Sequence, residues 1–408
     1  MMKKINTLCA VVVVASFNVA TVNAGVVTTD GPDLKIKTKG GFSVKTVDGD
    51  YGFQLGGRIQ IDADSYNGVI NKVDGDSTGS DIYFRRVRAE LKGHVKDWSY
   101  NFYYNLNEES SRLDVVNVTY NGWGNMLKLT MGKQKEGFGL DDSGSSKWTS
   151  AIERSIVSDA FDTGNNIGFM LHGHNDAITY NIGLFKEGSG ANNELDLATT
   201  GRFVYRPFNE NDNLLHLGVG FSNRSSNQGF DDFDGRLGVR GSEAGKTVNK
   251  AGVSFIDDID GDTMNIYNLE AAGVFGAFHF MAEYFSGEIS DLNNTASSDL
   301  KVDGYSTLVG WFLTGERHTY KTKTAVFDKV KPNNKGGAWE VFARVDNLGG
   351  DTGANVIVNE TDVITLGVNW YPTENVKIAF NYLNVKTDQP IGGEDDGNAF
   401  AARLQLAY

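Results

Sequence analysis

The chain ends in Phe-Ala-Ala-Arg-Leu-Gln-Leu-Ala-Tyr, residues 400–408. Because neighbouring side chains of an extended strand point to opposite faces, alternate residues of this stretch share one face. That face carries Phe400, Ala402, Leu404, Leu406 and Tyr408. A last strand with one apolar face and an aromatic end is typical of barrels in bacterial outer membranes. A strand buried in a soluble sandwich has no need of either feature.

The same alternation of apolar and polar residues recurs along the chain after residue 24. It is clearest in residues 52–64, 126–134, 337–346 and 362–371. Each segment lasts about ten residues, which is the length that a tilted strand needs to cross a bilayer. A soluble β-sandwich is the alternative, but its strands are usually only about five or six residues long. The polar face here also carries dense charge of both signs, as the lining of a wet lumen does.

This pattern predicts an all-β protein, a transmembrane antiparallel β-barrel of about 16 strands with an even strand number. The strands are expected at residues 52–64, 82–95, 99–108, 114–121, 126–134, 166–174, 177–186, 200–207, 214–223, 264–275, 277–286, 304–314, 337–346, 362–371, 375–385 and 398–408. Residues 234–241 also alternate, but they would make the number odd, so we assign them to a loop. Long connections then lie outside the cell, except residues 315–336, which form a long periplasmic connection.

The composition agrees with many strands joined by polar turns. The 408 residues include 49 Gly but only 5 Pro, and 11% are aromatic. Lys and Arg number 38 against 52 Asp and Glu, a formal net charge of -14. Such an acidic chain argues against nucleic acid as a partner, because its surface repels phosphate backbones.

The first 24 residues have the pattern of a secretory signal peptide. Two lysines precede an apolar run at residues 8–17, which is too short to span a membrane as a helix. We expect cleavage after Ala24, with an N-terminal anchor helix as the alternative. Cleavage would also remove Cys9, the single cysteine, so no disulfide is expected. Residues 25–51 are then a basic periplasmic lead-in, and residues 52–408 form the barrel.

A long connection follows the fifth expected strand at residues 135–165 and is a candidate for the pore constriction. Connections of this length are uncommon and usually functional. Its serine hydroxyls, backbone N–H groups, Lys147 and Arg154 together suit an oxyanion. The aromatic residues Phe138 and Trp148 favour a loop that folds inward over a solvated external loop.

Other charged groups carry weaker signals. Arg86, Arg88, Lys92 and His94 alternate on one strand with Glu90, which indicates either a basic lumen stripe or ordinary salt bridges. The acidic stretch 257–262 resembles part of a calcium loop but lacks its distal glutamate. Among the six histidines no pair has metal-ligand spacing except His172 and His174, which we interpret as polar lining. No serine lies in a nucleophile elbow.

The inward loop also resembles that of the phosphate-selective porin O/P family. The similarity rests on Ser145-Ser146-Lys147-Trp148 followed by Ala151-Ile152-Glu153-Arg154. It extends in order over residues 34–44, 53–58, 83–86, 313–332 and 365–371. The resemblance implies a trimer of sixteen-stranded barrels, each with a constricted anion site and basic residues that lead to it.

Ten candidate pore-lining or anion-binding residues follow from this resemblance. They are Arg58, Arg85, Arg86, Asp114, Ser145, Ser146, Arg154, Arg236, Lys321 and Lys331. The chain also departs from the family pattern. Asp142 replaces a lysine before the serine pair, Ser99 replaces another, and Asp232 and Asp234 stand where external arginines are expected. These changes predict weaker phosphate binding than the family pattern implies.

We therefore expect a passive outer-membrane channel for small inorganic anions such as phosphate or polyphosphate. The resemblance implies a homotrimer surrounded by outer-membrane lipid in a Gram-negative bacterium, with no cofactor, no metal and no catalytic residues. A general non-selective diffusion porin is the alternative. A barrel enzyme and an adhesin with a plugged lumen are further alternatives from other functional classes.

Overall fold

The computed structural model describes most of the chain after the first 24 residues. The described residues are 25–27, 30–38, 41–71, 78–107, 112–187, 195–210, 213–226, 234–242, 263–290, 300–351, 359–391 and 394–408. The expected signal peptide, Asp232 and the acidic stretch 257–262 lie outside these residues.

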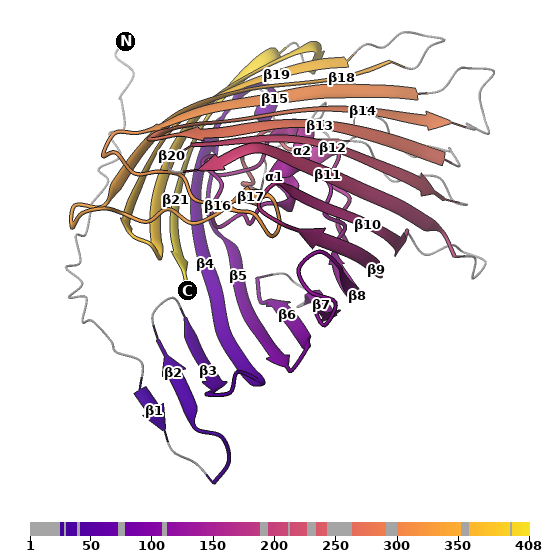
Figure 1. Cartoon of the computed structure of the whole chain (residues 1–408). Helices are drawn as coiled ribbons and strands as arrows, with labels where there is room; N and C mark the ends of the chain where they lie inside the picture. Colours follow the sequence, from indigo (N-terminus) through magenta and orange to yellow (C-terminus); the bar gives the residue numbers. More distant parts are fainter. Residues whose placement is uncertain are drawn as a thin grey trace.

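Sixteen antiparallel strands form a closed barrel, as the alternation predicted (Figure 1). They are β4 (Tyr51–Tyr66), β5 (Gly79–Val95), β6 (Trp98–Asn105), β7 (Arg112–Tyr120), β8 (Lys128–Lys135), β9 (Asn165–His174), β10 (Ile178–Lys186), β11 (Leu197–Glu210), β12 (Asn213–Ser225), β13 (Thr263–Phe275), β14 (Phe278–Ser290), β15 (Leu300–Phe312), β18 (Ala338–Asp351), β19 (Asn359–Thr373), β20 (Val376–Ile391) and β21 (Glu394–Ala407). Each strand pairs with the next, and β21 pairs with β4 to close the barrel. Closure satisfies the backbone hydrogen bonds that an open edge would leave unpaired in lipid.

The two faces of the wall differ as the alternation requires. On β19, Ile364, Leu366 and Val368 are 39–49% exposed on the outside, while Thr365 and Asn369 on the other face are at most 1% exposed. Apolar residues therefore face the membrane, and polar residues face the interior. Among the described residues, no helix is both long and apolar enough to cross a membrane.

The lead-in adds three short strands to the start of the barrel sheet. β1 (Gly25–Val27), β2 (Leu34–Lys37) and β3 (Phe42–Thr46) pair in sequence, and β3 pairs with the first residues of β4. From Arg58 onward, β4 pairs with β21 instead. Figure 1 shows β1 to β3 extending below the barrel.

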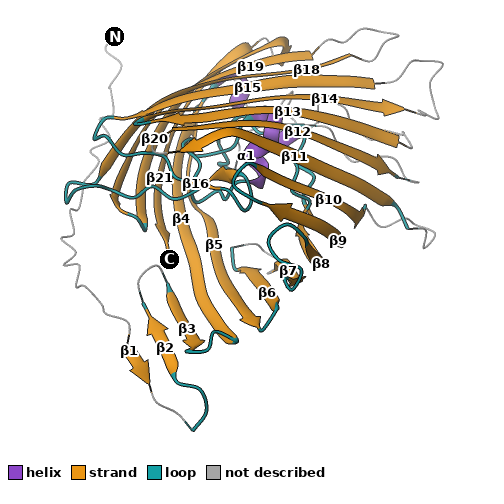
Figure 2. Cartoon of the chain, viewed as in Figure 1, coloured by secondary structure: helices purple, strands orange, loops and turns teal. Residues whose placement is uncertain are grey.

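The loop between β8 and β9, residues 136–164, folds into the barrel and is called the inward loop here. It contains α1 (Leu140–Ser143) and α2 (Ile156–Ala160), which lie inside the wall of strands in Figure 2. Phe138, Ile156 and Val157 are at most 1% exposed and pack in one cluster with side chains of β13, β14, β15 and β18. The inward direction expected from its aromatic residues is confirmed by this burial.

The long periplasmic connection, residues 313–337, also turns into the barrel and is called the periplasmic insert here. It contains the two-residue strands β16 (Tyr320–Lys321) and β17 (Val326–Phe327), which pair with each other. Val326 packs against Leu140 of the inward loop. The two inserted segments, one from each side of the membrane, therefore meet in the lumen.

Two shorter segments also pack inside the barrel. Residues 234–242 are not a wall strand, in agreement with the strand count, and bury Leu237 and Val239 in the same cluster as the inward loop. The single-turn helix η1 (Gly68–Ile70) follows β4 and buries Val69 and Ile70 there.

Candidate anion pathway

A β-bulge explains how two consecutive arginines reach the interior. Gln60 on β4 pairs with Arg86, but Ile61 pairs with Phe84, so Arg85 is an extra residue on β5. In a regular strand, neighbouring side chains point to opposite faces, whereas a bulge resets the alternation. Both guanidinium groups consequently lie within 4 Å of Glu153 of the inward loop.

Glu153 is the anchor of the inward loop. Arg85 donates to both of its oxygens at 2.8 and 3.0 Å, and Arg403 of β21 and Arg240 approach it at 2.7 and 3.2 Å. Arg86 lies 3.9 Å away. Burial opposes ionisation of Glu153, but the arginines outweigh it and hold the pKa of its carboxyl well below the usual range. Its negative charge thus fixes the loop against the wall.

Arg154 holds the inward loop together from inside. Its side chain donates to the carbonyl oxygens of Asp141, Asp142 and Gly144 at 3.0–3.3 Å and forms a 2.8 Å ion pair with the Asp142 carboxylate. Lys135 reaches the same carboxylate at 2.5 Å. Burial opposes ionisation of Asp142, yet Lys135 and Arg154 lower the pKa of its carboxyl. Asp142 is therefore a compensated charge within the loop.

A second buried carboxylate, Glu90 of β5, has a different environment. Lys147 of the inward loop lies 3.1 Å from its oxygens, Lys92 lies at 3.4 Å and Arg58 of β4 at 4.0 Å. We call these four residues the Glu90 cluster. Burial, together with repulsion from Arg58 and Lys92, lowers the pKa of Lys147 to about 8, although Glu90 opposes the shift. Three cations surround one carboxylate, which leaves an excess of two positive charges when all are ionised.

Hydrogen-bond donors and free space accompany this positive charge. Arg58 Nη1 donates to Ser146 Oγ at 2.6 Å, and the backbone N–H of Lys147 donates to Ser145 Oγ at 3.4 Å. A cavity of about 110 Å³ lies beside the cluster. Its lining includes Lys92, Lys147, Trp148, Lys329 and Tyr408.

Comparison with known proteins agrees with this architecture. Residues 53–408 match the family model described as phosphate-selective porin O and P. The chain belongs to this family. It is also 34% identical to Porin O of Pseudomonas aeruginosa, over 94% of this chain and 95% of that protein. The expected class, an outer-membrane porin for anions in a Gram-negative bacterium and not an enzyme, is thereby confirmed.

Solved structures resemble the porin in fold. OmpT of Vibrio cholerae in its trimer form has a TM-score of 0.59 at 12% identity, over 88% of this chain and 99% of that one. The anion-selective porin from Comamonas acidovorans has a TM-score of 0.57 at 12% identity, over 88% of this chain and 100% of that one. At such low identity, the agreement concerns the barrel alone.

A second bulge places Asp114 in the lumen of the porin. Tyr103 pairs with Val115 and Tyr104 with Leu113, so Asp114 is the extra residue on β7. Its carboxylate accepts a 2.8 Å hydrogen bond from Asn165 and forms an ion pair with Arg88. Arg88 is therefore compensated, unlike the cations of the Glu90 cluster.

Basic residues also gather at the periplasmic end. Lys321 and Lys331 lie exposed on the periplasmic insert, where the resemblance placed exit lysines. Lost hydration and repulsion from Lys128 and Lys321 lower the pKa of Lys323. Within the described part of the chain, neither Lys128, Lys321 nor Lys323 has a carboxylate within 4 Å. Sequence reasoning missed Lys128 and Lys323, although the alternation of 126–134 places Lys128 on the polar face.

The ten candidate residues thus divide among three places. Arg58, Ser145 and Ser146 belong to the Glu90 cluster and its surroundings, and Lys321 and Lys331 lie on the periplasmic insert. The third group lies in networks where side-chain or backbone contacts to polar groups hold the residues: Arg85, Arg86, Asp114, Arg154 and Arg236. For Arg236 the contact is a backbone N–H that donates to Asp159 at 2.9 Å.

Proposed function

We propose that the porin conducts small inorganic oxyanions, phosphate among them, and that they bind at the Glu90 cluster. The observation that carries this proposal is the excess of positive charge around Glu90, three cations against one carboxylate. Other cations of the lumen, such as Arg154 and Arg403, are matched by carboxylates at 2.6–2.8 Å. The description of the family as phosphate-selective supports the choice of ion.

The physical basis is electrostatic. A unit charge at about 4 Å contributes roughly 4 kcal/mol at an effective dielectric constant near 20, and lumen water screens part of it. Donors from Lys147, Lys92 and Arg58 can replace part of the hydration shell of an entering anion. The low-dielectric wall concentrates this field and raises the local anion concentration.

The sequence predicted weaker phosphate binding partly because Asp142 adds a negative charge to the inward loop. The ion pairs of Asp142 weaken this argument. Lys135 and Arg154 compensate that carboxylate, so it adds no uncompensated negative charge to the pathway. The replacement of external arginines by Asp232 and Asp234 is still expected to reduce the collection of anions at the outer mouth. Weakened anion selectivity therefore stays a prediction, and its proposed cause is the negative charge of Asp232 and Asp234 at the outer mouth.

Single-channel recording in planar bilayers tests the proposed site. The reversal potential in a chloride gradient reports the sign of selectivity, and added phosphate should block chloride current. We expect Lys147→Met to weaken both effects. Lys301→Met is the matched control, because Lys301 is 69% exposed and pairs at 3.7 Å with Glu288. A reversal potential near zero without phosphate block would instead identify a general diffusion porin, and an unchanged Lys147→Met channel would refute the site.

We further propose that the porin is a homotrimer whose subunits meet at the short strands. β6 and β8 have 8 residues each. A strand needs about 9–11 residues to cross a bilayer. Protein contact would cover this low part of the wall, and the similar OmpT structure is described as a trimer.

Phe169→Gln on β9 should dissociate the trimer in native mass spectrometry. Phe400→Gln on β21, a matched control with 63% rather than 61% exposure, should leave it intact. Monomeric wild-type protein, or equal effects of both changes, would contradict the proposed interface.

The proposal includes export to the outer membrane. We infer that residues 1–24 are removed as a signal peptide and that residues 25–51 remain as a periplasmic lead-in before the barrel. The mass of the protein purified from outer membranes checks the cleavage. A mass that includes the first 24 residues would favour the anchor helix.

A further inference from the structure

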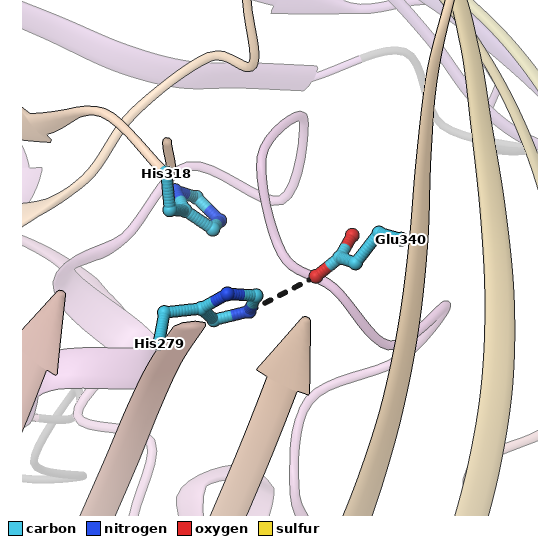
Figure 3. Close-up of side chains that lie close together, drawn as sticks. All are labelled: His279, His318 and Glu340. Carbon is cyan, nitrogen blue, oxygen red and sulfur yellow. Dashed lines mark ion pairs between the residues drawn. The ribbon is translucent and has the colours of Figure 1, made fainter. Parts of the chain in front are cut away.

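Three potential metal ligands from distant parts of the sequence meet inside the barrel. His279 comes from β14, His318 from the periplasmic insert and Glu340 from β18, and all three are at most 1% exposed (Figure 3). One ligand atom of each lies within 4.8 Å of the others. His279 Nε2 and Glu340 Oε1 are 3.0 Å apart, and the two imidazole rings are 4.9 Å apart.

We propose that His279, His318 and Glu340 bind a divalent transition-metal ion of the zinc type. Two imidazoles and a carboxylate are a ligand set that zinc accepts, at distances of about 2.0–2.2 Å. Two such ligands on one tetrahedral ion lie roughly 3.3 Å apart. The 3.0 Å separation of His279 from Glu340 already approaches that value. His318 needs only a small side-chain movement to complete the set.

The surrounding contacts orient these ligands. Glu340 Oε2 accepts hydrogen bonds from Asn369 at 2.8 Å and from the Tyr371 hydroxyl at 2.7 Å. His318 Nδ1 lies 3.2 Å from the carbonyl oxygen of Thr319, which leaves its Nε2 available for an ion. Metal-bound histidines commonly use their second nitrogen in this way.

One ring nitrogen of His279 supports the proposal independently. Its Nδ1 is buried and has no hydrogen-bond partner among the described residues. An unpaired buried polar atom is costly, and such atoms often mark an ion or water that belongs to the site. With the ion bound to Nε2 beside Glu340, the Nδ1 of this ring remains to donate to a water that belongs to the site.

The site borders a cavity, and two positive charges lie near it. A cavity beside it is lined by Leu140, Trp148 and Arg344 together with both histidines, and it has room for a water ligand. Ser150 Oγ donates to Glu340 Oε1 at 2.5 Å and helps to orient this carboxylate. Lys377 donates to the backbone oxygen of Ser150 at 3.0 Å, and its positive charge should limit the affinity.

A second imidazole–carboxylate pair in the same barrel serves as a matched control. His216 Nε2 lies 2.9 Å from Glu270, and its Nδ1 lies 2.7 Å from the Tyr320 hydroxyl. Arg202 donates to both oxygens of the Glu270 carboxylate at 2.7 Å. Both ring nitrogens are used, and Arg202 compensates the carboxylate. This pair lacks the second histidine and should not bind zinc.

Metal binding would connect the periplasmic insert to the wall. His318 is the ligand on the insert, whereas His279 and Glu340 lie on barrel strands. An ion shared among them should therefore raise the temperature at which the folded barrel unfolds, because it binds only the assembled site. Magnesium should have no such effect, since it prefers oxygen ligands.

The test uses the purified full-length porin after treatment with a chelator. Titration calorimetry with Zn²⁺ should show one ion per chain, and Co²⁺ should give the visible absorption of a tetrahedral site that Zn²⁺ abolishes. His318→Gln and Glu340→Gln should each weaken Zn²⁺ binding at least about tenfold, and His216→Gln should leave it unchanged. Heat-modifiable migration on gels confirms that each variant is a folded barrel.

Three results would overturn the proposal. They are the absence of stoichiometric Zn²⁺ binding to the wild type, equal binding by the His318→Gln variant, and equal loss in the His216→Gln variant. If His318→Gln fails to fold, the wild-type Co²⁺ spectrum decides alone, and its absence refutes the site.

Discussion

Glu153 and Glu90 are both buried carboxylates surrounded by cations, but their environments differ in net charge. Arg85, Arg240 and Arg403 contact Glu153, with Arg86 at 3.9 Å, and nearby carboxylates share Arg240 and Arg403. Arg403, for example, also pairs with Asp62 at 2.6 Å. Around Glu90 the described residues place no second carboxylate within 4 Å of Arg58, Lys92 or Lys147. The first network is close to balanced, and the second keeps a positive excess.

This difference separates two uses of arginine and lysine in one lumen. Balanced networks position the inward loop, because each buried charge there needs a partner to offset its lost hydration. In an unbalanced cluster, the excess positive charge can attract a mobile anion. Changes at Glu153 should therefore affect stability, and changes at the Glu90 cluster should affect ion selectivity.

The largest expected effect is that of Glu153→Gln. The change leaves Arg85, Arg240 and Arg403 without their shared carboxylate and should destabilise the folded barrel by about 3–5 kcal/mol. Thermal unfolding in detergent measures this loss. Glu288→Gln is the control, because Glu288 is 43% exposed and its surface pair contributes at most about 1 kcal/mol. Equal stability of the two variants would remove the distinction between the networks.

The second prediction concerns Glu90→Gln in a Lys147→Arg background, where the guanidinium group keeps position 147 charged after the carboxylate is lost. Removing the one carboxylate raises the positive excess of the cluster from two charges to three. After screening by lumen water, the added unit of positive charge should improve the free energy of phosphate binding by about 1.4 kcal/mol. Phosphate should therefore block chloride current about tenfold more tightly. Single-channel block by phosphate measures the change. Weaker block would mean that Glu90 itself positions the anion.

A third prediction follows from the pKa of Lys147, which burial lowers to about 8. As the pH rises from 7 to 9, Lys147 loses its proton, the positive excess falls and the anion selectivity should decrease. The reversal potential in a salt gradient follows this titration. Lys147→Arg should abolish the pH step, because a guanidinium group stays charged throughout this range. The same pH profile in both proteins would assign the step to another group.

The smallest expected effect belongs to Lys321 and Lys323 of the periplasmic insert. Lys321→Gln combined with Lys323→Gln should lower anion conductance by about twofold at 0.1 M salt, where the screening length is about 10 Å. At 1 M salt, with a screening length of about 3 Å, the effect should vanish. A loss that is independent of salt would indicate a change of pore shape instead of charge.

The amino-acid sequence determined the barrel. A strand exposed to lipid on one face and water on the other must alternate apolar and polar residues, and this pattern is local and can be counted. It therefore predicted sixteen strands and the loop status of residues 234–241. The length and the aromatic residues of the inward loop predicted its direction as well.

Only the tertiary structure decided which charges are free. The bulges at Arg85 and Asp114 reverse the alternation that the sequence alone implies, so both side chains reach the lumen. Lys135 and Arg154 compensate Asp142, and this pairing changed the role expected for that residue. His279, His318 and Glu340 show no spacing that links them in the sequence. Charge balance and ligand geometry depend on distances across the barrel, whereas alternation depends only on neighbours along the chain.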